Sequence, residues 1–274
     1  MKIVLLLLSL LSTAWAHAQT VQPPNLSARA WLLVDHASGQ SLVEHEADAR
    51  VEPASLTKLM TAYLTFAALK QGSLKLDQAV TVSERAWKAP GSRMFIDPKH
   101  PVTIGELIQG MIIQSGNDAC IALAEAIAGS EEAFAQRMNL EARRLGLANT
   151  HYVNATGLPD PQHYSTARDL AKLAQAVIRD FPEYYTTYSR KEYTYNRITQ
   201  PNRNRLLWLD PTVDGVKTGF TENAGYCLIA SSKRSARRLI SVVLGADSDS
   251  MRAQESQRLL NHGFLNFDAV RVHE

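Results

Sequence analysis

The sequence has only two cysteines among its 274 residues, so its fold cannot depend on a network of disulfide bonds. Cys120 lies in an apolar helical pattern and Cys227 in an apolar strand-like pattern, and we expect both to be unpaired core residues. The sequence also lacks a long run of one charge, since 29 Lys and Arg stand against 27 Asp and Glu. This balance is not typical of nucleic-acid binding, and we expect no nucleic-acid partner.

Histidine motifs are also missing. The sequence contains no His-Glu-x-x-His, the zinc site of many peptidases. Five histidines fall in no spacing typical of a metal site or of a Ser-His-Asp triad. They are His36, His45, His100, His151 and His163. We therefore predict neither a metal nor an organic cofactor.

The N-terminus carries the most apolar run of the chain. Lys2 is followed by an apolar stretch over residues 3–11 and by Ala16-His17-Ala18, a small-residue cleavage site, which predicts a secretory signal peptide over residues 1–18. The run is too short to span a bilayer, and serines interrupt it. An uncleaved anchor is the alternative, but we favour export, cleavage and a periplasmic location.

The remaining pattern alternates between strands and helices. Apolar residues over 30–34 and 40–44 flank a Gly-containing loop and predict a β-hairpin, and Pro53 then introduces a helix. From about residue 76 to 182 the pattern is mostly helical. Strands return after Glu192, and a helix follows near the end. This order predicts an α/β fold of the α+β kind, a sheet domain interrupted by an all-helical insert.

Three short motifs carry the chemistry. Ser55 and Lys58 stand three residues apart at a helix start, where they can share one face and act as nucleophile and base. Alone, this spacing has little specificity. Ser115-Gly116-Asn117 and Lys217-Thr218-Gly219 follow in that order, with room between them for whole structural elements. The three together point to one site.

With their surroundings, these motifs resemble the low-molecular-mass penicillin-binding proteins, the serine D-alanyl-D-alanine carboxypeptidases. The matching stretches are Pro-Ala-Ser-Leu-Thr-Lys-Leu-Met at 53–60, Gln-Ser-Gly-Asn-Asp-Ala-Cys at 114–120, Ser-Thr-Ala-Arg-Asp at 165–169 and Asp-Gly-Val-Lys-Thr-Gly at 214–219. The resemblance implies a β-lactamase/transpeptidase-like fold, with an antiparallel five-stranded sheet packed by helices. It also implies that Lys217 lies on an edge strand facing Ser55.

The catalytic residues predicted from this set are Ser55, Lys58 and Ser115. Ser55 is the nucleophile. Lys58 can serve as its base only when neutral, and its apolar neighbours favour partial burial, which lowers a lysine pKa. Ser115 can pass a proton to the leaving amine.

The remaining predicted site residues bind substrate; they are Asn117, Lys217, Thr218, Gly219, Phe220 and Arg252. Asn117 can hold a substrate amide, and Lys217 with Thr218 can hold a terminal carboxylate, while Gly219 lets the substrate approach the strand. The resemblance makes the Phe220 N–H an oxyanion donor beside the Ser55 N–H. It also suggests Arg252 as a second carboxylate ligand, with an exposed helix arginine as the alternative.

The function this predicts is removal of the terminal D-Ala from peptidoglycan stem peptides, with β-lactams acylating Ser55. A D,D-endopeptidase acting on peptide cross-links would use the same residues. A β-lactamase is disfavoured because the chain has no Glu between Glu141 and Glu183 to position a deacylating water, and we expect a long-lived penicillin adduct. A catalytically silent cell-wall binding module would not need the nucleophile.

We expect residues 19–27 to be a linker and residues 28–272 to be the catalytic domain, with the helical insert at about 76–182. Many carboxypeptidases of this kind continue into a β-rich domain and an amphipathic C-terminal helix, and we predict no such β-domain before Glu274. Peripheral membrane association is expected only if a C-terminal extension is missing from the sequence.

Overall fold

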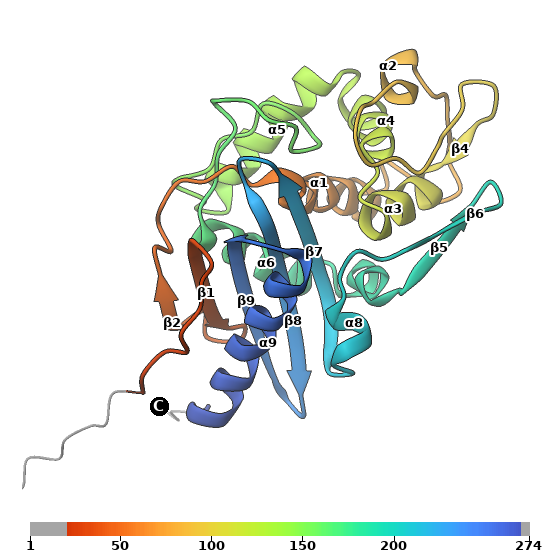
Figure 1. The fold of residues 1–274 in the computed structure, drawn as a ribbon. Helices are drawn as coiled ribbons and strands as arrows, with labels where there is room; N and C mark the ends of the chain where they lie inside the picture. Colours follow the sequence, from red (N-terminus) through yellow and green to blue (C-terminus); the bar gives the residue numbers. More distant parts are fainter. Residues whose placement is uncertain (1–20, 270–274) are drawn as a thin grey trace, which may run out of the picture.

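A computed structural model describes residues 21–269 of the protein (Figure 1). The predicted signal peptide, residues 1–18, lies outside the described residues. The described chain folds into a sheet with a helical region at one end, and Figure 1 shows strands β7, β8 and β9 leading up to that region.

The central sheet has five antiparallel strands in the order β2, β1, β9, β8, β7. In chain order these are β1 (Ala30–Asp35), β2 (Ser41–His45), β7 (Val213–Thr221), β8 (Gly225–Arg234) and β9 (Arg237–Ala246). The predicted five-stranded antiparallel sheet is therefore confirmed. The predicted hairpin of β1 and β2 is also present, and β7 is the edge strand that carries Lys217.

The alternation of side chains along β1 divides the interior into two cores. Ala30, Leu32 and Val34 belong to the larger core, whereas Trp31 and Leu33 belong to the smaller one. This is the pattern of a strand with both faces covered. Helix α6 (Ala167–Asp180) contributes to the larger core and α9 (Asp249–Asn266) to the smaller one.

The helical region is built from α1 (Lys58–Lys70), α2 (Glu84–Trp87), α3 (Ile104–Ile113), α4 (Asn117–Ala128) and α5 (Glu131–Arg144). Its helix starts are well specified by the sequence. The side chain of Thr103 accepts from the Glu106 N–H and the Glu106 carboxylate accepts in return, which is the predicted capping box of α3. Ser130 caps α5 by accepting from the Ala133 N–H.

The predicted all-helical insert needs two corrections. Two short strands, β3 (Ala79–Val80) and β4 (Val102–Thr103), pair at the start of α3, because the Ile104 and Gly105 amides donate to carbonyls of the segment before β3. Helix α6 falls within the predicted bounds of the insert but packs against β1 and β9 of the sheet. The segment is mostly helical rather than all-helical.

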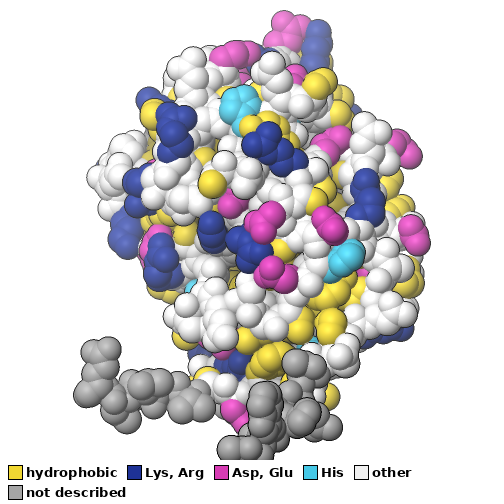
Figure 2. All heavy atoms as spheres, turned by 90° about the vertical axis from the view of Figure 1, so that its left-hand side faces the viewer, with side chains coloured by type: hydrophobic (Ala, Val, Ile, Leu, Met, Phe, Trp, Pro, Cys, Tyr) yellow, Lys and Arg dark blue, Asp and Glu magenta, His cyan; other side chains and the backbone are white. Residues whose placement is uncertain are grey.

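The segment that leads from α6 to the sheet edge carries α7 (Pro182–Tyr185), η2 (Thr186–Ser189), the hairpin of β5 (Glu192–Tyr195) and β6 (Ile198–Pro201), and α8 (Leu206–Leu209). Within residues 21–269, no helix is long and apolar enough to cross a membrane. Lys and Arg are interspersed with Asp and Glu on the face seen in Figure 2, in agreement with the balanced composition.

Candidate active site

The first Ser–Lys pair lies at the start of α1. Ser55 belongs to a short 3₁₀ turn, η1 (Ala54–Thr57), and Lys58 is the first residue of α1. The Lys58 Nζ donates to the Ser55 Oγ over 2.9 Å, and it also donates to the Thr156 carbonyl over 2.6 Å. The predicted shared face of Ser55 and Lys58 is therefore present, on a 3₁₀ turn followed by an α-helix.

Lys58 is only 1% exposed, which makes its charged form costly. Burial is the main cause that lowers the pKa of Lys58 to about 8, and the positive charge of Arg203 acts in the same direction. Near neutral pH a minor fraction of Lys58 is therefore unprotonated and able to act as a base. A neutral amine in contact with the Ser55 hydroxyl can accept its proton.

The loop that supplies the Thr156 carbonyl was missed in the sequence. The Asn154 Oδ1 accepts from the Thr156 N–H over 3.1 Å and from the Gly157 N–H over 2.7 Å. Gly157 has φ +85°, and a Cβ there would lie 1.8 Å from the Ala54 carbonyl oxygen. An Asn followed three residues later by Gly was the available signal for this turn, although nothing local places the turn beside Ser55.

The second Ser–Lys pair consists of Ser115 and Lys217. Ser115 has φ +64° in the turn between α3 and α4. The Lys217 Nζ donates to the Ser115 Oγ over 2.9 Å and to the Thr218 carbonyl over 2.9 Å. Lys217 is 3% exposed, and burial, together with the positive charge of Lys58, holds its pKa well below the usual lysine value.

Asn117 begins α4 and is tied to a neighbouring loop. Its Nδ2 donates to the Pro90 carbonyl over 2.6 Å, and its N–H donates to the Ser92 carbonyl over 2.7 Å. Asp118 was not among the predicted site residues, but its buried carboxylate accepts from the N–H groups of Met94 (3.0 Å) and Phe95 (2.8 Å). Asn117 and Asp118 therefore hold the loop that carries Ser92.

Strand β7 passes very close to η1. A Cβ on Gly219 would lie 3.1 Å from the Pro53 carbonyl oxygen and 3.3 Å from the Ala54 Cβ. Glycine at this position allows the edge strand to face Ser55, as the resemblance implied. Phe220 follows at the cleft mouth, where its ring is 44% exposed and its centroid lies 4.4 Å from that of Tyr226.

Arg252 lies on α9, beside the inner part of β7. Its Nη1 donates to the Gly219 carbonyl over 3.0 Å and to the Cys227 carbonyl over 3.4 Å, and its Nη2 donates to Asp249. It is 6% exposed. The alternative prediction of an exposed helix arginine is therefore wrong.

These residues surround a cleft of about 600 Å³. Its lining includes six predicted site residues, namely Ser55, Ser115, Thr218, Gly219, Phe220 and Arg252. Lys58 and Lys217 each donate to one of the two serines, and Asn117 is buried at the start of α4. Residues that line the cleft and were missed are Ser92, Gln200, Pro201, Asn202, Arg203, Arg205, Tyr226 and Asp249.

Cys120 and Cys227 are buried and unpaired, as predicted. Burial raises the pKa of the Cys120 thiol to about 12 and that of Cys227 to about 11. Across the part of the chain that the structure describes, there is no group of three or more His, Cys, Asp or Glu that could hold a metal.

A five-stranded antiparallel sheet, a helical region, and a Ser–Lys pair with a buried lysine at their junction define the class of penicillin-binding, transpeptidase-like serine enzymes. Comparison with known proteins agrees. Residues 17–248 match the family described as D-alanyl-D-alanine carboxypeptidase, peptidase family S11. The chain therefore belongs to this family, which confirms the resemblance seen in the motifs.

One curated relative is the D-alanyl-D-alanine carboxypeptidase DacC of Escherichia coli, 51% identical over 94% of this chain and 66% of its own length. The chain thus spans about two thirds of that relative. Among solved structures, penicillin-binding protein 5 of Haemophilus influenzae matches with a TM-score of 0.89 at 46% identity, covering 90% of this chain and 74% of that one.

Penicillin-binding protein D2 of Listeria monocytogenes, solved with bound ampicillin, matches with a TM-score of 0.82 at 32% identity. The match covers 89% of this chain and 100% of that one.

Proposed function

We propose that the protein is a serine D-Ala-D-Ala carboxypeptidase that removes the terminal D-Ala from peptidoglycan stem peptides. The observation that carries this proposal is the 2.9 Å contact between the Nζ of the buried Lys58 and the Oγ of Ser55, which lines the cleft. Family membership supports the same activity.

Acylation begins at Ser55. The neutral Lys58 amine takes the hydroxyl proton as the Ser55 Oγ bonds to the carbonyl carbon of the penultimate D-Ala. The C–N bond to the terminal D-Ala then breaks, and the leaving nitrogen receives a proton through Ser115, which Lys217 holds in position. The products of this step are free D-Ala and an ester on Ser55.

The tetrahedral intermediate carries a negative oxygen that needs fixed donors. We assign these to the backbone N–H groups of Ser55 and Phe220. The close approach of Gly219 to Pro53 and Ala54 supports this assignment, because it brings the two backbones together at the cleft.

The substrate-binding residues bind different groups of the substrate. Lys217, Thr218 and Arg252 take the terminal carboxylate, since Lys217 and Thr218 are neighbours on β7 and Arg252 donates to the carbonyl of the next residue, Gly219. Asn117 takes a substrate amide N–H through its side-chain oxygen, while its side-chain nitrogen donates to the Pro90 carbonyl.

Water then attacks the Ser55 ester and releases the shortened stem peptide. β-Lactams acylate Ser55 by the same first step. Among residues 21–269, the Lys58 amine donates to the Ser55 Oγ and to the Thr156 carbonyl, and neither Lys58 nor Ser55 has a carboxylate partner. A long-lived penicillin adduct is therefore expected, in contrast to a β-lactamase that uses a glutamate-positioned water.

The test uses purified protein, a fluorescent penicillin, a pentapeptide muropeptide and a cross-linked muropeptide dimer. We expect labelling of the wild type, no labelling of Ser55→Ala, and D-Ala release from the pentapeptide. Cleavage of the dimer alone would make the protein a D,D-endopeptidase. D-Ala release by Ser55→Ala would overturn the catalytic assignment, and rapid turnover of the penicillin would favour a β-lactamase.

We further propose that residues 28–272 form the catalytic unit and that the protein acts in the periplasm after export. The bacterial cell-wall enzymes among its relatives support the location, and the signal-peptide pattern supports export. Detection of the processed chain in a periplasmic fraction tests this proposal, and a cytoplasmic, unprocessed chain would contradict it.

A further inference from the structure

An acidic residue lies between two arginines on the wall of the cleft. The Asp249 carboxylate accepts a hydrogen bond from the Arg252 guanidinium, and it lies 3.4 Å from the Arg205 Nε. All three side chains line the cleft together with Thr218 and Gly219. A single carboxylate is therefore shared by two cations at the place proposed for the substrate's terminal carboxylate.

Asp249 is not needed to place the Arg252 guanidinium. The Arg252 Nη1 is already held by the carbonyls of Gly219 and Cys227, from β7 and β8. The Tyr226 ring lies 5.4 Å from the guanidinium carbon and restricts it further. The sheet therefore fixes the position of Arg252, which leaves charge as the main contribution of Asp249.

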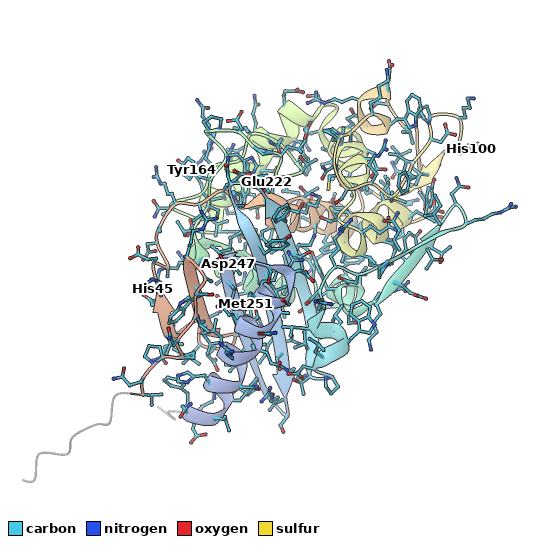
Figure 3. The ribbon with its side chains drawn as sticks, in the orientation of Figure 1. His45, His100, Tyr164, Glu222, Asp247 and Met251 are labelled. Carbon is cyan, nitrogen blue, oxygen red and sulfur yellow. The ribbon has the colours of Figure 1, made fainter. Side chains whose placement is uncertain are left out.

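Asp249 is also accessible from the cleft. Its side chain is 39% exposed, whereas that of Arg252 is 8% exposed. It is the first residue of α9, which follows the cap at Ser248, so its backbone position is fixed while its carboxylate faces the opening. Figure 3 labels Asp247 and Met251, the residues two before and two after it, at this end of α9.

We propose that Asp249 is a specificity-determining residue that competes with the terminal carboxylate of the substrate for Arg252. This inference rests on the proposed function, which assigns the carboxylate pocket to Lys217, Thr218 and Arg252. Binding energy that is equal in the ground state and the transition state lowers KM without raising kcat. By partly neutralising Arg252, Asp249 limits the affinity for a free carboxylate and assists the departure of the released D-Ala.

The test compares two peptides, acetylated D-Ala-D-Ala with a free carboxylate and the same peptide with a C-terminal amide. Each is titrated as a protectant of Ser55 against a fluorescent penicillin, so the readout does not require turnover. The carboxylate preference is the ratio of the half-protecting concentration of the amide to that of the acid.

In Asp249→Asn we expect this preference to rise about three- to ten-fold, the size expected for removing one charge at a partly exposed site. The variant keeps the shape of the side chain and an oxygen that can accept from Arg252. Asp249→Glu should return the preference to within about two-fold of the wild type. Asp247→Asn is the matched control, because Asp247 forms no salt bridge within residues 21–269, and its preference should stay at the wild-type value.

The rise in preference should shrink at about 1 M salt, because an exposed charge is screened over short distances there. An unchanged or lower preference in Asp249→Asn, or a wild type that does not distinguish acid from amide, would overturn the inference. Absence of D-Ala release from a pentapeptide would overturn the proposed function instead, while the protection ratios would still report on Asp249.

Discussion

The cleft contains two Ser–Lys pairs of nearly equal geometry, and they are built in different ways. Lys58 and Ser55 are three residues apart, and one turn of chain brings them to 2.9 Å. Lys217 and Ser115 are 102 residues apart and reach the same distance only because β7 passes the turn before α4. The first pair is a product of local geometry, whereas the second depends on the whole fold.

The two lysines share one electrostatic environment despite this difference. Both are buried, and burial lowers the pKa of both. The positive charge of Lys58 also lowers the pKa of Lys217, and the positive charge of Arg203 lowers the pKa of both lysines. The protonation state of Lys58 therefore depends on its burial and on Arg203. Variants at each lysine separate the contributions of the two pairs.

Replacing Lys58 by Met should have the largest effect. We expect the rate of Ser55 acylation by penicillin to fall about 10³-fold or more, because the base is lost. The melting temperature should stay the same or rise, since a buried amine is replaced by an apolar side chain of similar length. Stopped-flow labelling and thermal unfolding measure the two quantities.

Lys70→Met, at the exposed end of the same helix, is the control and should keep the acylation rate within about two-fold. A Lys58→Met variant that still acylates at a rate close to the wild type would show that another group is the base.

Replacing Lys217 by Gln should lower kcat/KM for a pentapeptide about 10²-fold. The Ser115 hydroxyl then loses its cationic donor, and the carboxylate loses one of its ligands. Lys233→Gln, at the exposed end of β8, should leave kcat/KM unchanged. Steady-state kinetics measure both, and an unaffected Lys217→Gln variant would remove the second pair from the proposed mechanism.

Gly157→Ala tests how the loop that carries Gly157 supports the Ser55–Lys58 pair. The new Cβ would meet the Ala54 carbonyl, so η1 or the loop must move. We expect a loss of about 3 kcal/mol in the free energy of unfolding and a slower acylation of Ser55.

Gly129→Ala separates backbone strain from this contact. Gly129 has φ +82°, close to the +85° of Gly157, but a Cβ there meets nothing within 4 Å. It should cost about 1 kcal/mol and leave acylation unchanged. Equal effects of the two variants in denaturant unfolding would show that the contact with Ala54 is unimportant.

The shift in the pH dependence of the acylation rate should be the smallest of these effects. Because Lys58 acts as a base only when neutral, the acylation rate should rise with pH through about 8 and level off above it. In Arg203→Gln the rise should move to higher pH, since Arg203 is a neighbouring positive charge that lowers the pKa of Lys58. A midpoint that stays in place, measured by labelling rates across the pH range, would mean that the charge of Arg203 does not act on Lys58.

The sequence predicted those parts of the molecule that have local or motif-level signals. The β1–β2 hairpin, the capping box at Thr103 and the Ser55–Lys58 pair each follow from neighbouring residues. Lys217 was placed by its motif and the family resemblance, and the edge strand confirms it.

The contacts that the sequence did not predict join segments that are distant in the chain. The Thr156 carbonyl reaches Lys58 across 98 residues. Asp249 was missed because its importance depends on Arg205 and Arg252 meeting at the cleft. The short pair of β3 and β4 was missed because two-residue strands leave no alternating pattern.

The roles of Ser55 and Lys58 are tested most directly by mass spectrometry of the protein after exposure to a penicillin. We predict one covalent adduct per chain, carried by the peptide that contains Ser55, and no adduct in the Lys58→Met variant over the same time. An adduct on Ser115 or another residue, or a wild-type protein that forms none, would contradict the assignment of Ser55 and Lys58 as nucleophile and base.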